Sequence, residues 1–160
     1  MPEPLSDVFN VLLVGVGGQG IVLASDILAE AAMHAGLDAK KSEIHGMSQR
    51  GGSVSSDVRY GAKVHSPMVP AGEADFLVVL TDTQVDVARP MLKTGGTLIV
   101  PAAVDANRLP NKKSLNVALL GALAKHLEFP AEVWHAAIKQ KLAEKLHEVN
   151  LSAFELGRTA

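Results

Sequence analysis

Cysteine is absent from the 160-residue sequence. A disulfide, a thiol nucleophile and a cysteine-ligated iron–sulfur cluster are therefore impossible within this chain. Long apolar segments are missing too, since no run reaches the roughly 20 residues that a membrane-crossing helix needs. The N-terminus, Met1-Pro2-Glu3-Pro4, lacks the basic start of a signal peptide. We therefore expect a cytoplasmic protein, and any iron–sulfur centre with which it works must lie on a partner.

Positive charge is not concentrated anywhere in the sequence. The formal net charge is −2 and the basic residues are scattered, whereas nucleic acids and anionic membranes are bound by clustered positive charge. We therefore predict neither a nucleic-acid partner nor a membrane partner. With 48% hydrophobic and 20% charged residues, the chain has the make-up of one compact domain over residues 1–160.

Residues 10–44 have the pattern of a βαβ unit. An apolar run at residues 11–14 ends in a glycine-rich turn at residues 15–20, and apolar residues then recur at helical spacing from Ile21. The helix is predicted to end near Gly36. Residues 37–44 have the composition of a second strand.

A polar, glycine-rich loop follows at residues 45–52, where a doubly wound fold normally places a helix. Beyond it, apolar and polar side chains alternate over residues 53–60 with the period of a half-buried strand. Gly61 and Ala62 could turn the chain into a partner strand at residues 63–66. The sequence therefore predicts an inserted antiparallel hairpin.

The parallel α/β pattern resumes at residues 75–80, a continuous apolar strand suited to burial on both faces. A helix is predicted over residues 84–92, followed by a turn at Gly95-Gly96 and a buried strand over residues 97–100. Together with the opening unit, these elements predict an α/β fold. We expect three α/β/α layers around a mostly parallel, mixed sheet.

The sequence after residue 114 is predicted to be helical. One helix is expected over residues 115–127, and a second begins at Pro130, a residue favoured at helix starts. Its apolar face is predicted to carry a stripe that packs on the core. The residues of this stripe are Trp134, Ile138, Leu142, Leu146 and Val149.

The glycine-rich turn is the first candidate binding site. Its G-x-G-x-x-G spacing lets backbone N–H groups at a helix N-terminus approach a phosphate or carboxylate closely. A tight strand-to-helix turn without a ligand would need the same glycines. Nicotinamide dinucleotides would also require an acidic residue about 20 positions on, and Glu43 is the only candidate. The candidate residues are Gly15, Gly17, Gly18, Gln19 and Gly20.

The second candidate site is the polar loop. It combines a guanidinium with two glycines that permit sharp backbone turns, which suits an anionic ligand or an acidic group of a partner. A solvated arginine at the entrance of a hairpin is the alternative. The candidate residues are Ser48, Gln49, Arg50, Gly51 and Gly52.

No catalytic residue and no metal ligand is predicted in this chain. The six histidines include no close pair with metal-ligand spacing. The serines at positions 53, 55 and 56 are not part of a G-x-S-x-G nucleophile elbow. The sequence therefore gives no support for a hydrolase.

Two separated motifs occur in order along the chain. They are Gly15-Val16-Gly17-Gly18-Gln19-Gly20 and His45-Gly46-Met47-Ser48-Gln49-Arg50-Gly51-Gly52-Ser53-Val54, with Val58-Arg59, Ser66-Pro67 and Ala74-Asp75 further on. This pattern resembles the gamma subunit or domain of 2-oxoacid:ferredoxin oxidoreductases. The second motif is similar to the indolepyruvate branch in particular, whose smaller subunit is of this kind.

The resemblance implies membership of a complex that oxidatively decarboxylates a 2-oxoacid and forms an acyl-coenzyme A. Thiamine diphosphate, magnesium and iron–sulfur clusters are expected on the catalytic partner subunits, with ferredoxin as an indirect partner and coenzyme A as co-substrate. This chain would hold none of the cofactors alone and would be inactive alone, contributing a cleft wall and subunit contacts. An isolated copy could form a homodimer through apolar surface meant for its partner.

The sequence also departs from the family pattern. Residues 81–86 replace a segment that is usually rich in glutamate, and the stretch between Val100 and Asn116 is shorter than is usual. Two other functions therefore stay open. One is a stand-alone NAD(P)-binding oxidoreductase of Rossmann type, and the other is a non-catalytic domain that binds a nucleotide or coenzyme A.

Overall fold

The computed structural model describes residues 8–45 and 53–160. A five-stranded sheet forms its centre, with the strand order β2-β3-β1-β4-β5. Strands β1, β4 and β5 are parallel, whereas β3 is antiparallel to both β1 and β2. The strands are β1 (Phe9–Val16), β2 (Asp38–His45), β3 (Ser53–Gly61), β4 (Ala74–Val79) and β5 (Leu92–Ile99). The predicted α/β class with a mixed sheet is confirmed.

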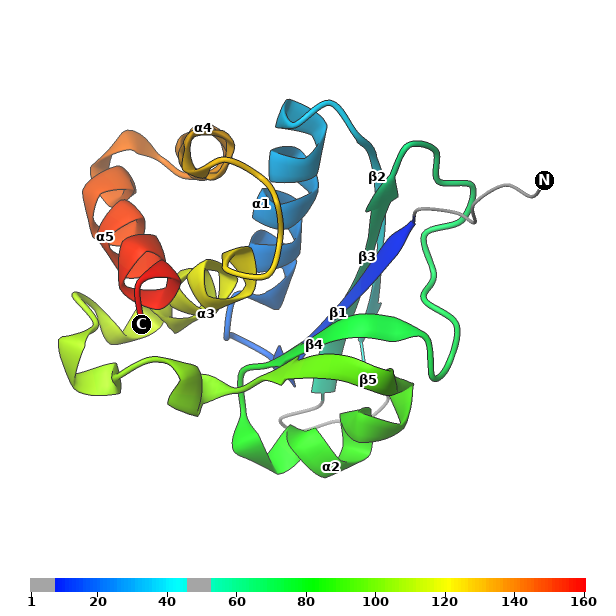
Figure 1. The fold of residues 1–160 in the computed structure, drawn as a ribbon. Helices are drawn as coiled ribbons and strands as arrows, with labels where there is room; N and C mark the ends of the chain where they lie inside the picture. Colours follow the sequence, from blue (N-terminus) through cyan, green and yellow to red (C-terminus); the bar gives the residue numbers. More distant parts are fainter. Residues whose placement is uncertain (1–7, 46–52) are drawn as a thin grey trace.

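Four of the helices gather on one side of the sheet, and the short helix α2 lies apart from them beside β5 (Figure 1). None of the helices in the described ranges is long and apolar enough to span a membrane. The helices are α1 (Ile21–His34), α2 (Val85–Ala88), α3 (Leu115–Ala124), α4 (Ala131–Lys141) and α5 (His147–Arg158).

Strand β1 is buried on both faces, which explains its unbroken apolar run. Val11 and Leu13 belong to the larger core cluster, which also contains α1 and α3. Leu12 and Val14 belong to a smaller cluster on the opposite face, which Ala88 of α2 joins. The larger cluster fixes the helices next to the carboxyl end of β1, where the glycine-rich turn begins.

Helix α3 is held in the core by backbone contact with α5. A Cβ added to Gly121 would collide with the carbonyl oxygen of Phe154, and one added to Gly157 would collide with that of Ala118. Glycine at both positions therefore lets the two helices approach closely. This contact sets the position of α3, whose first turn lies beside the glycine-rich turn.

The sheet contains an antiparallel hairpin, but the predicted pairing of residues 53–60 with residues 63–66 is wrong. Residues 63–66 form no strand, because both edges of β3 are already paired, one with β2 and the other with β1. The hairpin is instead made by β2 and β3. The loop that joins them, residues 46–52, lies outside the described residues.

Gly95 and Gly96 lie within β5, not in a turn before it. The register advances from Ala74 opposite Leu92 to Phe76 opposite Thr97, so β5 bulges between these pairs. Gly95 has a φ of 84°, and a Cβ on Gly96 would lie 3.0 Å from the carbonyl oxygen of Ala74. The two glycines therefore mark a bulge at the sheet edge.

The apolar stripe predicted along one helix is divided between two helices. Helix α4 ends at Lys141, and Leu142 and Ala143 have extended backbone conformations with ψ near 150°. The chain then turns through a short 3₁₀ segment into α5. Trp134 and Ile138 are fully buried on α4, whereas Leu146 is exposed and ends the connecting turn.

Candidate functional site

The glycine-rich turn connects the carboxyl end of β1 to the start of α1. Gly18 and Gly20 have φ values of 87° and 78°, a conformation that other residues rarely adopt. Gly17 and Gly18 are exposed, and a Cβ on either would meet no atom within 4 Å. At Gly15, which is buried, a Cβ would lie 2.7 Å from Gln19 Oε1. The inner glycine therefore serves packing, and the outer two leave the backbone open to a ligand.

Gln19 connects the turn to the end of β1 and to the segment that follows β4. Its Oε1 accepts hydrogen bonds from the N–H of Val16 at 2.8 Å and from the hydroxyl of Thr81 at 2.5 Å. Its Nε2 is 3.4 Å from the carbonyl oxygen of Leu80, to which it donates. Both acceptor sites of the side-chain oxygen are thus filled. Gln19 shapes the turn through these bonds, so a ligand would be bound by the turn's backbone more than by this side chain.

Asn116, at the start of α3, fixes the turn from the other side. It is only 5% exposed, and its Nδ2 donates to the carbonyl oxygen of Gly20 at 3.1 Å. Its Oδ1 accepts from the N–H of Val117 at 2.9 Å. A Cβ on Gly20 would collide with the Asn116 amide. The first turns of α1 and α3 are thereby joined.

A pocket of about 460 Å³ lies between the turn and the chain segment that leads into α3. Its polar wall holds the glycine backbone, Asn116 and two lysines, and its apolar wall holds three leucines. The lining residues are Gly18, Gln19, Gly20, Leu23, Leu80, Lys112, Lys113, Leu115 and Asn116. We call this hollow the glycine pocket.

The glycine pocket is electrostatically suited to an anion. The first N–H groups of α1 have no partner within the helix, and a helix N-terminus carries a partial positive charge. The first turn of α1 contains no acidic residue. Neither Lys112 nor Lys113 forms an ion pair with a carboxylate of the described ranges. The N-terminus of α1 and the two lysines therefore present positive charge to the glycine pocket without a paired carboxylate among the described residues.

The second candidate group, Ser48 to Gly52, lies outside the described residues. Its flanks are nevertheless informative, because Ser53 pairs with Val16, the residue at the start of the turn, and His45 pairs with Val54. The loop therefore leaves and re-enters the sheet at the end that carries the glycine-rich turn.

Glu43 is not placed as a dinucleotide site would require. Strand β3 separates β2 from β1, so Glu43 lies two strands away from the turn. Its carboxylate pairs with Lys41, which also contacts Asp26 at 2.9 Å. Among the described residues, no group of three or more histidines, aspartates or glutamates could hold a metal ion.

The sequence matches the model of one protein family, described as pyruvate ferredoxin/flavodoxin oxidoreductase, over residues 10–114 and 100–160. The chain belongs to this family. It is 34% identical to indolepyruvate oxidoreductase subunit IorB of Pyrococcus horikoshii, over 93% of this chain and 94% of that one. It is 35% identical to the Thermococcus kodakarensis protein of the same name, with the same coverage.

Solved structures agree with this assignment. The gamma subunit of a keto/oxoacid ferredoxin oxidoreductase from Geobacter sulfurreducens matches with a TM-score of 0.80 and 27% identity, over 93% of this chain and 95% of that one. The 2-oxoglutarate:ferredoxin oxidoreductase of Magnetococcus marinus has a TM-score of 0.81 over 96% of this chain and 31% of its own. At 18% identity the second likeness shows the fold alone.

The chain is shorter than the Pyrococcus protein within their alignment. The alignment with the Pyrococcus protein has 191 positions, whereas 93% of 160 residues is about 149, so about 42 positions have no residue here. The two matches to the family model overlap at residues 100–114, so the alignment to the family is interrupted in this region. In this chain the region contains three 3₁₀ turns, and the last of them carries Lys112 and Lys113 to the glycine pocket.

No local sequence pattern identifies Lys112, Lys113 or Thr81 as site residues. The two lysines stand shortly before the helix expected over residues 115–127, and only that position could have drawn attention to them. Thr81 reaches Gln19 from 62 positions away, and nothing in the local pattern signals that contact.

Proposed function

We propose that this chain is the gamma-type subunit of a 2-oxoacid:ferredoxin oxidoreductase that acts on indolepyruvate or another aryl or branched 2-oxoacid. The observation that carries the proposal is the match, over nearly the whole of both chains, to two indolepyruvate oxidoreductase subunits. The chain's own chemistry agrees, because it has no cysteine with which to ligate a cluster. Decarboxylation and electron transfer therefore belong to partner subunits.

The residues in the ranges 8–45 and 53–160 do not fit thiamine diphosphate, and the sequence has no cysteine to ligate an iron–sulfur cluster. Thiamine diphosphate is held through a metal ion, and the described residues bring together no set of carboxylates or histidines for one. Magnesium, thiamine diphosphate and the clusters are accordingly assigned to the partner.

The glycine pocket is the contribution of this chain to the substrate cleft. We assign to it the phosphate groups of coenzyme A, a ligand named for the Magnetococcus structure. Backbone N–H groups of the turn and the ammonium groups of Lys112 and Lys113 would donate to phosphate oxygens. Leu23, Leu80 and Leu115 line the same hollow and would exclude water from it.

Kinetics of the reconstituted complex test this assignment. Lys112→Ala and Lys113→Ala should each raise the KM for coenzyme A by about tenfold, because a hydrogen bond to a charged group contributes about 1.5–3 kcal/mol and 1.4 kcal/mol is a factor of ten. The KM for the 2-oxoacid should not change. Lys145→Ala, an exposed lysine outside the pocket, is the matched control. An unchanged KM for coenzyme A in both pocket variants would remove the assignment.

The alternative of a stand-alone NAD(P)-dependent oxidoreductase is disfavoured by the position of Glu43 and by the inserted strand β3. Calorimetry separates the two functions. The isolated chain titrated with NADH or NADPH should show no micromolar binding. Micromolar binding, together with substrate reduction in the absence of any partner, would favour the alternative.

A further inference from the structure

Four of the six aromatic residues in the chain line one hollow of about 210 Å³. Phe9 stacks on Tyr60 with 5.3 Å between ring centroids, and Tyr60 meets Phe129 edge to face at 5.2 Å. Phe76 lies 6.0 Å from the ring of His126. The remaining lining residues are Leu37, Leu127 and Glu128. We call this hollow the aromatic pocket.

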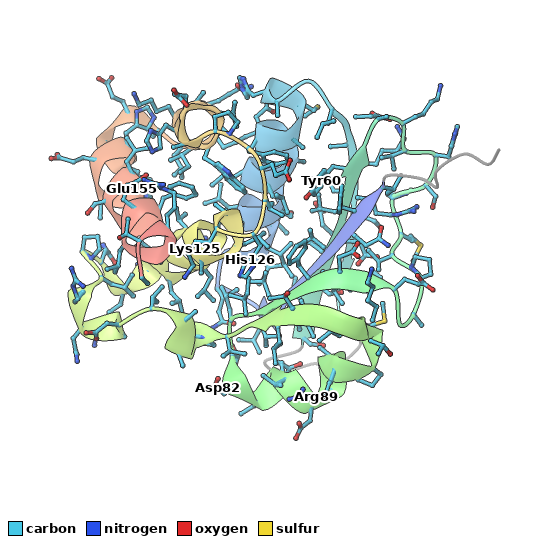
Figure 2. The ribbon with its side chains drawn as sticks, viewed as in Figure 1. Tyr60, Asp82, Arg89, Lys125, His126 and Glu155 are labelled. Atoms are coloured by element: carbon cyan, nitrogen blue, oxygen red, sulfur yellow. The ribbon has the colours of Figure 1, made fainter. Side chains whose placement is uncertain are left out.

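The aromatic pocket is remote from the glycine pocket. Phe9 faces Tyr60 at one end of the β1–β3 pairing, whereas Val16 faces Ser53 at the other. Seven residue steps along a strand span about 23 Å. Tyr60 and His126 lie on the side of the sheet that carries the helices (Figure 2). The two hollows therefore lie at opposite ends of β1.

Three polar groups line the aromatic pocket: the hydroxyl of Tyr60, the imidazole of His126 and the carboxylate of Glu128. Tyr60 is only 3% exposed, and its hydroxyl can both donate and accept a hydrogen bond. Burial, with the nearby carboxylates of Asp75 and Glu128, raises the pKa of Tyr60, so the hydroxyl stays neutral. Asp75 is paired with Lys93 at 2.7 Å. Glu128 forms no ion pair within the described ranges.

The aromatic rings and the Glu128 carboxylate make this pocket suited to bind a cationic group. The faces of aromatic rings carry a negative quadrupole that attracts ammonium and guanidinium groups. An exposed carboxylate at the rim adds a full negative charge, and the Tyr60 hydroxyl oxygen can accept one hydrogen bond. A planar guanidinium can stack on one ring while donating to both oxygens.

We propose that the aromatic pocket receives one basic side chain, an arginine or a lysine, from the partner subunit of the complex. The identity of the partner rests on the proposed function, whereas the preference for a cation rests on the pocket alone. Phe9 is 46% exposed at the rim, so its ring is available to cover the incoming side chain. Interfaces use arginine and aromatic residues as central anchors in this way.

The chemistry of the pocket can be tested on the isolated full chain. Amide shifts in nitrogen–proton NMR spectra are followed during titration with n-butylguanidinium, an arginine side-chain analogue, and with n-butylurea, its neutral counterpart. Butylguanidinium should shift the amides of Leu37, Tyr60 and Leu127 and leave Leu23 of the glycine pocket unmoved. Butylurea should bind at least fivefold more weakly. Equal binding of the two, or no binding of butylguanidinium, would overturn the proposal.

A variant pair connects this chemistry to assembly. Glu128→Gln should weaken butylguanidinium binding at least threefold and weaken association with the partner subunit, measured by biolayer interferometry. Glu144→Gln, at another exposed glutamate, should change neither. Unchanged partner association for Glu128→Gln would contradict the proposal. Absence of ferredoxin reduction by the wild-type complex would instead contradict the proposed function. The butylguanidinium titration does not depend on activity, so the two failures can be distinguished.

Discussion

Replacing Gly20 with alanine disturbs the contact that joins the glycine-rich turn to α3. Gly20 has a left-handed backbone conformation with a φ of 78°, and its carbonyl oxygen accepts the hydrogen bond from Asn116. A methyl group at this position would be strained by the backbone and would collide with the Asn116 amide. The substitution therefore has two separable costs.

The magnitudes follow from the geometry. The left-handed conformation costs a non-glycine residue about 1–2 kcal/mol. Displacement of the Asn116 amide removes a hydrogen bond that contributes about 0.5–1.5 kcal/mol. Gly20→Ala should thus destabilise the fold by about 1.5–3.5 kcal/mol, and at about 2–4 °C per kcal/mol for a chain of this size the Tm should fall by about 7 °C.

A double-mutant cycle with thermal denaturation separates the two costs. In Asn116→Ala only the Cβ remains, and it would lie 3.8 Å from the new methyl group, an ordinary contact. The losses of unfolding free energy in the two single variants should therefore add up to about 1 kcal/mol more than the loss in the double variant. Gly36→Ala is the control for strain alone, because Gly36 has a φ of 88° and an open surround. The reasoning is refuted if Gly20→Ala costs no more than Gly36→Ala and the cycle is additive.

Two further predictions concern stability. Burial raises the pKa of Asp57 above 3.8, and the hydrogen bond that its carboxylate accepts from the N–H of Val69 partly offsets this shift. The folded state therefore favours the protonated carboxyl more than the unfolded state does. Asp57 thus lowers the free energy of unfolding as the pH rises from 3.8 through its folded-state pKa. Urea denaturation should show Asp57→Asn to be more stabilising relative to wild type at pH 7 than at pH 4, and an equal difference at both would contradict this. Gly157→Ala places a methyl group against the carbonyl of Ala118 and should lower the free energy of unfolding by about 3 kcal/mol. The control Ser152→Ala, at an exposed position of the same helix, should lower it by less than about 0.5 kcal/mol. Similar melting temperatures for the two variants would exclude the close α3–α5 contact.

Much of the fold could be predicted because its signals are local. The apolar run of β1, the glycines that end it and the helical spacing from Ile21 each follow from a few neighbouring residues. The break between α4 and α5 could not be predicted, because apolar residues continue at helical spacing through Leu142 and Leu146 and no proline or glycine interrupts them. That break is imposed by the packing of α5 on α3, which only the folded chain shows.

The glycine-rich turn of the candidate site could be predicted from the sequence, whereas the side chains that line the rest of the glycine pocket could not. The spacing of Gly15, Gly17 and Gly20 identifies a strand-to-helix turn open to an anion. Lys112 and Asn116 reach the same place from nearly a hundred residues further along the chain, and no local pattern reports so distant a contact. The role of Arg50 stays a prediction, since its loop lies outside the described residues.

The most direct measurement of the central claim is ferredoxin reduction by separated and recombined subunits. The isolated chain, supplied with indolepyruvate, coenzyme A and oxidised ferredoxin, should reduce no ferredoxin. The cysteine-containing, thiamine-binding partner should gain coenzyme A-dependent activity when this chain is added in equimolar amount. Ferredoxin reduction by this chain alone, or full activity of the partner without it, would contradict the account.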